Sequence, residues 1–284
     1  MSINVPNVEI TEFASDVKAE YQASGFKTKK AIRLRNNVVG STVRFPISSE
    51  GIAQQKAIQA DVVPMNVSYA NAIATLQDWH ASEYSDIFSQ ATINWDERME
   101  LVKVCAGAIG RRMDQLVIDQ LDLSNPATVV AVGATNFTYV KFREALAGIH
   151  QNNAGQNGVY CAISANAEEE LMGESNLMSS DFVNQQATNN GGLDGLKLAG
   201  VNWMVFGNMT EGGLDLSGTT RKCYMWDKEA VGMGIGIDFR TEINYVAEKL
   251  SYLVSSVFKA GAVVVASDAA SAKGVARISI DESA

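Results

Sequence analysis

The residues of this chain whose types could support metal or acid–base chemistry are few and scattered. The two histidines, His80 and His150, lie far apart in the sequence. Only His80 has carboxylates nearby, Asp78 and Glu83, and one histidine beside isolated carboxylates is a weak metal pattern. We therefore expect both histidines to be exposed or hydrogen-bonded, and we expect no metal site.

The three cysteines, Cys105, Cys161 and Cys223, are odd in number and widely spaced, and no Cys-x-x-Cys pair occurs. This spacing is typical of neither a disulfide framework nor a zinc site. We predict buried free thiols in a protein made in a reducing compartment.

Glycines alternate in the segment GMGIGID, from Gly232 to Asp238. The spacing differs from the dinucleotide-binding pattern GxGxxG and no helix is predicted after it, so we expect close packing or a β-bulge in a strand. The P-loop, metalloprotease and serine-hydrolase patterns do not occur. Three successive acids, Glu168, Glu169 and Glu170, suit the start of a helix. The sequence therefore predicts no catalytic residue and no cofactor. We expect a protein that is not an enzyme.

A basic segment, KKAIRLRNNVVGSTVRFPI, extends from Lys29 to Ile47. Apolar and basic residues alternate on both sides of NNVVGS, which predicts a ribbon of two strands joined by a turn. Six basic residues lie between Lys27 and Arg44, and no acid occurs between Glu20 and Glu50. Three interpretations stay open: a nucleic-acid surface, a charged edge strand in solvent, or an arm that lies on an acidic neighbour.

Charge favours the acidic neighbour. The chain has a net charge of −9, which disfavours tight binding to nucleic-acid phosphates. Residues 76–123 carry nine acids and four bases, so a basic ribbon and an acidic segment occur in one chain. This combination suits head-to-tail contacts between copies, which close into rings or shells. The candidate contact residues are Lys30, Arg33, Arg35, Arg44, Phe45 and Lys56 on the basic side, and Asp96, Glu97 and Glu100 on the acidic side.

With 284 residues and 46% hydrophobic content, the chain is long enough for one or two domains with buried cores. A long helix is predicted at about residues 94–123, because Asn94 is a suitable N-cap, apolar residues recur every three or four positions, and Pro126 follows. A second helix is predicted at about residues 139–152, and short strands at VYCAIS and in LKLAGVNWMVF. No signal peptide or membrane-spanning run is recognised, so we expect a soluble protein made in the cytoplasm.

In this order, the elements resemble the major capsid proteins of tailed bacteriophages, which share the Hong Kong ninety-seven type capsid fold. VVGSTVRFPI is similar to the strand leading into that family's extended loop, and NWDERMELVKVCAGAIGRRMDQLVIDQL is similar to its spine helix. VYCAISANAEEELM and LKLAGVNWMVF resemble parts of its axial domain, and the segment from YMWDKEAVGMGIGID to FKAGAVVV resembles its closing strands. The resemblance covers essentially the whole chain.

The resemblance implies an α+β fold with four parts. These are an N-terminal arm at residues 1–26, an extended β-hairpin loop at 27–75, a peripheral domain at 76–155 completed by strands at about 238–259, and an axial domain at 156–237 completed by 260–284. It implies a major capsid protein whose hexamers and pentamers form an icosahedral virion shell around double-stranded DNA, without sequence-specific binding or a membrane. The shell would assemble in the bacterial host cytoplasm. Because the chain reaches the arm directly after Met1, a separate scaffolding protein is expected, with a portal protein and a decoration or cement protein as further partners.

The main alternative is an encapsulin-type nanocompartment, which has the same fold and encloses cargo enzymes. An α+β enzyme and a nucleic-acid-binding module are further alternatives. Some members of the capsid family cross-link a loop lysine to a neighbour's asparagine. Lys56 lies near the predicted loop tip, but no acceptor asparagine is identified in this sequence. We therefore do not predict a cross-link at Lys56.

Overall fold

The computed structural model of the chain describes residues 26–59, 61–93, 96–174, 192–208, 210–265 and 272–283. Apart from Phe26, the predicted arm lies outside these residues, as do Asn94 and Trp95. The helices are α1 Ile87–Thr92, α2 Glu97–Leu123, α3 Tyr139–Gln151 and α4 Ala165–Gly173, with the 3-10 helices η1 Lys27–Lys30 and η2 Lys228–Ala230. The strands are β1 Arg33–Arg35, β2 Thr42–Ser48, β3 Tyr69–Thr75, β4 Gln77–Asp86, β5 Pro126–Val130, β6 Val159–Ser164, β7 Lys197–Leu198, β8 Val201–Phe206, β9 Leu216–Ser217, β10 Thr220–Asp227, β11 Val231–Val246, β12 Ser251–Val264 and β13 Ala272–Asp281.

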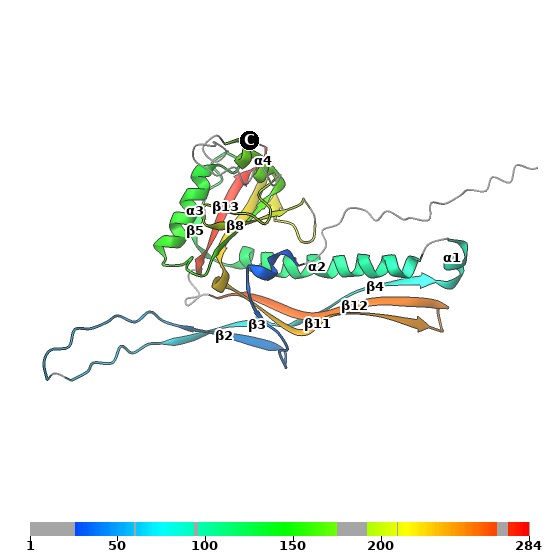
Figure 1. Cartoon of the computed structure of the whole chain (residues 1–284), viewed down its shortest axis with the longest axis horizontal. Helices are drawn as coiled ribbons and strands as arrows, with labels where there is room; N and C mark the ends of the chain where they lie inside the picture. The colour runs from blue at the N-terminus through cyan, green and yellow to red at the C-terminus, as the bar shows by residue number, and fades with distance from the viewer. Residues whose placement is uncertain are drawn as a thin grey trace, which may run out of the picture.

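Two sheets of the described chain form the body of the subunit, and a separate hairpin projects from it (Figure 1). The long sheet has the order β1-β11-β12-β4, in which β1 is parallel to β11 and the other pairs are antiparallel. The compact sheet has the order β5-β13-β10-β6-β8-β7, with β9 beside β10. Helix α2 lies along the long sheet, and α3 and α4 pack on the compact sheet. The predicted α+β fold class is confirmed.

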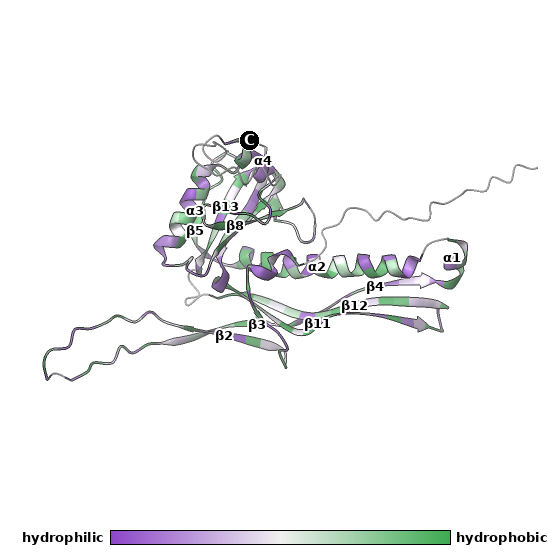
Figure 2. Ribbon diagram, viewed as in Figure 1, coloured by the Kyte–Doolittle hydropathy of each residue, from purple (hydrophilic) through white to green (hydrophobic). Residues whose placement is uncertain are grey.

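The predicted long helix is α2, whose 27 residues span about 40 Å. Its N-cap is Asp96 and not Asn94, because the Asp96 carboxylate accepts a hydrogen bond from Arg98 N at 3.1 Å. Apolar and polar residues alternate along the helix (Figure 2). Ile109 is buried, but Met99 is 58% exposed, so the predicted apolar stripe is not covered over its first turns. Among the described elements, the long sheet lies beside those turns, whereas the compact sheet also covers the C-terminal half of α2 (Figure 1).

One hydrophobic core joins the two sheets. The rings of Phe142 on α3 and Trp203 on β8 are buried against each other, with centroids 5.1 Å apart. Trp226 of β10 is also fully buried, and its Nε1 donates a hydrogen bond to Ala31 O at 2.9 Å, close to β1 of the long sheet. The two sheets are therefore packed together through apolar side chains and a buried hydrogen bond.

Several shorter elements agree with the sequence predictions. Helix α3 covers Tyr139–Gln151, and VYCAIS forms β6. Ser164 caps α4, because its hydroxyl accepts a hydrogen bond from Ala167 N at 3.2 Å. β7 and β8 form a hairpin whose turn residues, Ala199 and Gly200, have φ values of 52° and 81°. Positive φ at both central positions is typical of a type I′ hairpin turn.

The predicted pairing of the basic ribbon is wrong. β1 pairs with β11, whereas β2 pairs antiparallel with β3. Between β1 and β2, Asn37 and Gly40 have φ values of 57° and 117°, and Val38 N donates to Ile235 O at 3.0 Å. These contacts lead the chain away from β1 instead of folding it back along that strand. The projecting element is therefore the hairpin β2–β3 with residues 49–68 at its tip, here called the hairpin loop.

Sheet membership differs from the predicted domain bounds in three places. Residues 27–35 form η1 and β1 on the body, although they were assigned to the extended loop. β5 and α3 belong with the compact sheet, because β5 pairs with β13 and α3 packs on the same strand. The predicted peripheral domain, residues 76–155, includes both elements. β11 and β12 extend the long sheet over residues 231–264, beyond the predicted 238–259.

Candidate assembly surface

The base of the hairpin is seated on β11 by one aromatic ring. Phe45 is fully buried, and a Cβ atom at Gly232 would lie 2.7 Å from Phe45 Cζ. The guanidinium carbons of Arg33 and Arg35 lie 5.8 and 5.6 Å from the centre of the ring, within cation–π range. Phe45 therefore has no exposed surface to offer a neighbour and is not part of the candidate contact surface. Only a glycine allows the ring to approach β11 so closely.

The glycine row of β11 continues this contact. A Cβ atom at Gly234 would lie 2.5 Å from Val43 Cγ1, and one at Gly236 would lie 3.2 Å from Leu76 Cδ1. The register between β11 and β12 shifts after Ile235, which marks a bulge or irregularity. The segment GMGIGID thus combines close packing with an irregular ladder, as its alternating glycines predicted.

The basic residues of the ribbon divide into two groups. Arg33 is engaged within its own subunit, because its Nη1 lies 3.3 Å from Glu229 Oε2 in addition to the Phe45 contact. Arg44 and Lys56 are exposed, and neither forms an ion pair with another described residue. Lys30 and Arg35 are also exposed, Lys30 on η1 and Arg35 at the end of β1. Four of the five candidate cations are therefore exposed: Lys30 and Arg35 on the body of the subunit, and Arg44 and Lys56 on the hairpin.

The hairpin loop also exposes large apolar side chains, which the sequence analysis did not single out. These are Ile52, Ile58, Val62, Val63 and Met65, with 55–96% of each side chain exposed. Their signal in the sequence is the run of apolar residues around Pro64, in a segment without strand or helix periodicity. Exposed apolar residues gathered on one segment mark an interaction surface.

The acidic candidates lie at the start of α2. Asp96 caps the helix and is exposed. Glu97 Oε2 accepts a hydrogen bond from Ser85 Oγ at 2.6 Å, and Glu100 Oε2 lies 3.1 Å from Lys103 Nζ. Glu100 Oε1 is buried and has no hydrogen-bond partner among the described residues. Each carboxylate thus has a role within the subunit, and Asp96 is the most accessible.

The hairpin loop and the acidic candidates lie at opposite ends of the long sheet. The hairpin loop projects at the left of the long sheet, whereas α1 and the start of α2 lie at its right end (Figure 1). Phe88 of α1 is 68% exposed and Met99 of α2 is 58% exposed at this acidic end. One subunit cannot join these two surfaces to each other, but two subunits placed head to tail can.

Asp114 fixes η1 to α2 below the compact sheet. Its carboxylate accepts hydrogen bonds from Lys27 N at 3.1 Å, Thr28 N at 2.9 Å and Thr28 Oγ1 at 2.8 Å. Burial raises the pKa of this carboxyl, against the opposing effect of the hydrogen bonds from Thr28 and Lys27. This anchor holds the point where the preceding arm joins the body.

A second carboxylate, Asp122, joins the end of α2 to β10. Asp122 Oδ1 accepts hydrogen bonds from Lys222 Nζ at 2.7 Å and Tyr224 Oη at 2.9 Å. Partial burial acts to raise the pKa of Asp122, but the hydrogen bonds from Lys222 and Tyr224 outweigh it, and the pKa lies below its ordinary value. Lys222 Nζ also lies 2.9 Å from Asp215 Oδ2, so it links two acidic residues.

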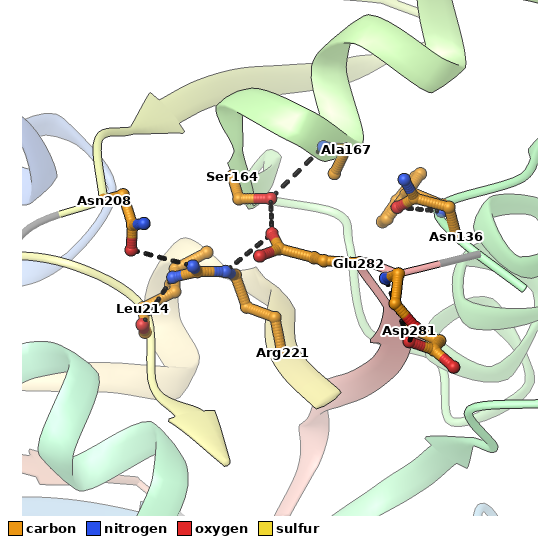
Figure 3. A network of polar contacts seen from close by, with 10 residues as sticks. Asn136, Ser164, Ala167, Asn208, Leu214, Arg221, Asp281 and Glu282 are labelled. Carbon is orange, nitrogen blue, oxygen red and sulfur yellow. Dashed lines mark hydrogen bonds and ion pairs between the residues drawn. The ribbon is translucent and has the colours of Figure 1, made fainter. Parts of the chain in front are cut away.

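The C-terminal residues are held by a buried ion pair (Figure 3). Arg221 and Glu282 side chains are 2% and 9% exposed, and Arg221 Nε donates to Glu282 Oε1 at 2.6 Å. Arg221 also donates to Leu214 O and to Asn208 Oδ1, both at 2.9 Å. Ser164 Oγ donates to Glu282 Oε1 at 2.6 Å while it caps α4. No local sequence pattern indicates this network, because its members come from distant segments.

The residues considered for chemistry do not converge. His80 and His150 are exposed and lie on β4 and α3. Within the described ranges, no three His, Cys, Asp or Glu side chains are placed to hold a metal ion. The three cysteines are free and buried, as predicted, and burial raises the pKa of Cys223 to about 12. In the same part of the chain, no helix is both long and apolar enough to cross a membrane.

Comparisons with known proteins agree with this arrangement. Residues 5–282 match the family model of phage capsid proteins. The capsid structure of the cyanophage P-SCSP1u is similar, with a TM-score of 0.73, 15% identity, and coverage of 95% of this chain and 92% of that chain. The head structure of Helicobacter pylori bacteriophage KHP40 has a TM-score of 0.73 and 12% identity, with 98% and 96% of the two chains covered. A solved structure from Mycobacterium phage Che8 has a TM-score of 0.70 and 15% identity, with coverage of 96% of this chain and 97% of that chain. Among proteins with curated descriptions, none is significantly similar in sequence.

The match extends over nearly the whole chain, and the solved structures share its fold from end to end. The family implies a structural role and a place in the virion. None of these matches supports the encapsulin-type compartment, the enzyme or the nucleic-acid-binding module. The chain therefore belongs to the phage capsid protein family, as a major capsid protein whose copies form the phage shell.

Proposed function

We propose that copies of this capsid subunit pair head to tail, with the hairpin loop of one lying on the acidic end of the next. The observation that carries this proposal is that the exposed apolar side chains of the hairpin loop and those of α1 and the start of α2 lie at opposite ends of the long sheet (Figure 1). Such contacts join different patches on each copy, and they close into rings and shells when the rotation between copies is suitable. In the proposed shell, hexamers and pentamers of the subunit build an icosahedral head around double-stranded DNA.

Apolar burial contributes more to this contact than charge. Burying one large apolar side chain stabilises a contact by about 1.5–3 kcal/mol, and the hairpin loop exposes five such side chains. An exposed ion pair contributes only about 0–1 kcal/mol. The charges of Arg44 and Lys56, facing Asp96 and its neighbours, then act mainly on orientation and on the rate of encounter.

The parts of the subunit take different positions in this proposal. The long sheet with α2 serves as the peripheral domain, and the compact sheet with α3 and α4 serves as the axial domain around five-fold and six-fold positions. Assembly in the bacterial cytoplasm uses a separate scaffolding protein and a portal protein, with a decoration or cement protein as a further partner. The net charge of −9 suits a shell that encloses DNA without binding its sequence.

The proposal is tested by replacing apolar residues of the hairpin loop in the full chain. Ile58→Ser with Val62→Ser should leave the thermal unfolding of the subunit unchanged, because both side chains are already exposed. The double variant should fail to form shells or rings in negative-stain electron microscopy and sedimentation, under conditions in which the original chain forms them. Arg44→Gln with Lys56→Gln should slow assembly and change its salt dependence.

The matched control is Val140→Ser, since Val140 is 66% exposed on α3, away from the hairpin. This variant should assemble like the original chain. Shells of normal yield and stability from the loop variant would overturn the head-to-tail contact.

A further inference from the structure

One edge of the long sheet is open along the second half of β11. β1 pairs with β11 over Gly232–Gly234, and Val38 N then donates to Ile235 O. From Ile237 to Val246, β12 is the one strand of the described chain that pairs with β11. The other side of this strand therefore presents backbone N–H and C=O groups to the surroundings. Such an edge is a template for pairing with another strand.

The side chains along this edge are exposed as well. Phe239 and Ile243 are 41% and 43% exposed, because α2 packs chiefly on β12 and β4 and leaves β11 largely uncovered. The side chains of Arg240 and Glu242 are 66% and 49% exposed. A second strand beside β11 would thus meet both apolar and charged side chains.

The register with β12 shows which of these side chains share a face of the sheet. Thr241 and Ile243 alternate with Tyr245 on one face, and Tyr245 lies opposite Tyr252 of β12. The guanidinium carbon of Arg98, on α2, lies 5.0 Å from the centre of the Tyr252 ring. This face of β11 is therefore the one on the side of α2.

The regular part of the edge begins at the bulge. The register shifts between Ile237 and Arg240, so β11 has an extra residue there. Phe239 lines a hollow of about 660 Å³ between α2 and β11, which places its ring on the side of α2. Arg240 and Glu242 lie on the opposite face of the sheet, since they alternate with their neighbours. Regular alternation of the two faces thus includes the residues from Phe239 to Ile243.

These five residues complement themselves when two copies of the strand run antiparallel about Thr241. Thr241 then meets its own equivalent at a two-fold axis. Arg240 stands opposite Glu242 of the second copy, and Phe239 stands opposite Ile243 of the second copy. In each pair the two side chains lie on the same face. Opposite charges and aromatic–aliphatic pairs that face each other across antiparallel strands stabilise the pairing, and the two-fold axis applies each pair twice.

The ion pair already present in each strand does not cancel this complementarity. Arg240 Nη2 lies 3.2 Å from Glu242 Oε1 of the same strand. Antiparallel pairing keeps this contact and places a second carboxylate beside each guanidinium. The four charges then alternate in sign around the axis. Because they are exposed, they act on the register of the pairing more than on its strength.

Other registers of the same two strands lack these pairs. An axis at Arg240 or at Glu242 sets two like charges directly opposite each other, which is destabilising. An axis at Ile243 sets Arg240 opposite Val246 and Glu242 opposite Asn244, and the charges lose their partners. An axis between two residues pairs side chains from opposite faces of the sheet. The axis at Thr241 is therefore the register that the side chains favour.

We propose that two copies of the subunit pair along residues 239–243 of β11, antiparallel and across a two-fold axis at Thr241. The long sheets of the two copies then join into one continuous sheet with both α2 helices on the same face. The mode is strand addition to an open sheet edge, and the contact is isologous. It uses the side of the long sheet and not its two ends. The proposal does not depend on head-to-tail pairing, so the two proposals fail separately.

Disulfide formation in the purified, unassembled full chain tests the register. Opposite Cα atoms of an antiparallel ladder lie about 4.5–5.5 Å apart, within the range that a disulfide spans. Thr241→Cys should therefore give a disulfide-linked dimer under mild oxidation, seen on a non-reducing gel. The native cysteines are buried and do not compete.

The matched control is Ile243→Cys, on the same face of the same strand. In the proposed register the two equivalents of this position lie four residues apart, about 13 Å along the strand. The Thr241→Cys dimer should form at least about tenfold faster than the Ile243→Cys dimer, because only the first pair is within bonding distance. Equal rates for the two variants, whether fast or slow, would overturn the pairing.

Charge reversal in the Thr241→Cys chain separates the contact between copies from the ion pair within one strand. Arg240→Glu and Glu242→Arg should each slow dimer formation, because four like charges then meet around the axis. An equimolar mixture of the two reversed chains should restore it as mixed dimers, identified by their mass, because the acids of one copy face the bases of the other. Neither reversed chain keeps the ion pair within its own strand, so that pair cannot explain the restoration. Mixed dimers that form no faster than the dimers of each chain alone would overturn the proposal.

Discussion

The ring of Phe45 occupies the space directly above Gly232, so closely that a Cβ atom at Gly232 would lie 2.7 Å from Phe45 Cζ. This contact joins the base of the projecting hairpin to β11. The loop that reaches outward is therefore carried on a base that is packed like a protein core. Because the base of the hairpin is packed on β11, the exposed apolar loop points away from its own subunit.

Gly232→Ala should destabilise the subunit by about 1–3 kcal/mol, because the added methyl group overlaps the Phe45 ring and one of the two must move. Urea unfolding of the purified subunit measures this change. Gly173→Ala is the control, since a Cβ atom there meets nothing within 4 Å, and it should be close to neutral. Equal stability of the Gly232→Ala variant and the original chain would contradict the close packing.

Arg221→Met and Glu282→Gln should each destabilise the subunit by about 3–5 kcal/mol, because each leaves a buried charge without its partner. The double variant should be less unstable than the sum of the two single variants. Arg240→Met is the control, because its ion pair with Glu242 is exposed and should contribute about 1 kcal/mol or less. Additive effects in the double-mutant cycle would argue against a coupled buried pair.

Asp122→Asn should be less stable than the original chain at neutral pH, and the difference should disappear in acid. The folded-state pKa of Asp122 lies below its ordinary value of 3.8, so the stabilisation is present above about pH 4 and is lost as the pH falls through the folded-state pKa. Unfolding free energies measured from pH 6 down to pH 2.5 follow this loss. Asp61→Asn, in the exposed hairpin loop, serves as the control. A difference that persists at the lowest pH would contradict the role of the charged carboxylate.

Asp114→Asn should release η1 from α2. An asparagine keeps only one accepting oxygen, so a backbone N–H of Lys27 or Thr28 loses its partner in a buried site, at a cost of about 1–3 kcal/mol. Amide exchange at residues 26–31 should accelerate more than exchange in the compact sheet. The control is Glu144→Gln, on the exposed side of α3, which should leave amide exchange unchanged both at residues 26–31 and in the compact sheet. Unchanged exchange at η1 would show that other contacts hold it.

The sequence by itself determined the elements that depend on near neighbours. The end of α2 before Pro126, the bounds of α3 and the strands at VYCAIS and in LKLAGVNWMVF were all predicted. Caps, turn residues and apolar periodicity act within about four residues along the chain, so they can be read without a structure. The order of these elements carried the resemblance to capsid proteins.

Only the tertiary structure decided which distant segments meet. β1 was predicted to pair with its neighbour in sequence, but it pairs with β11, about 200 residues away. Phe45 was assigned to an outer contact, but the glycines of β11 make room for it inside the subunit. Alternation along a strand shows which side chains share a face, but not which surface covers that face. That choice depends on complementary packing between remote parts of the chain, and for the same reason the Arg221–Glu282 pair had no local signal.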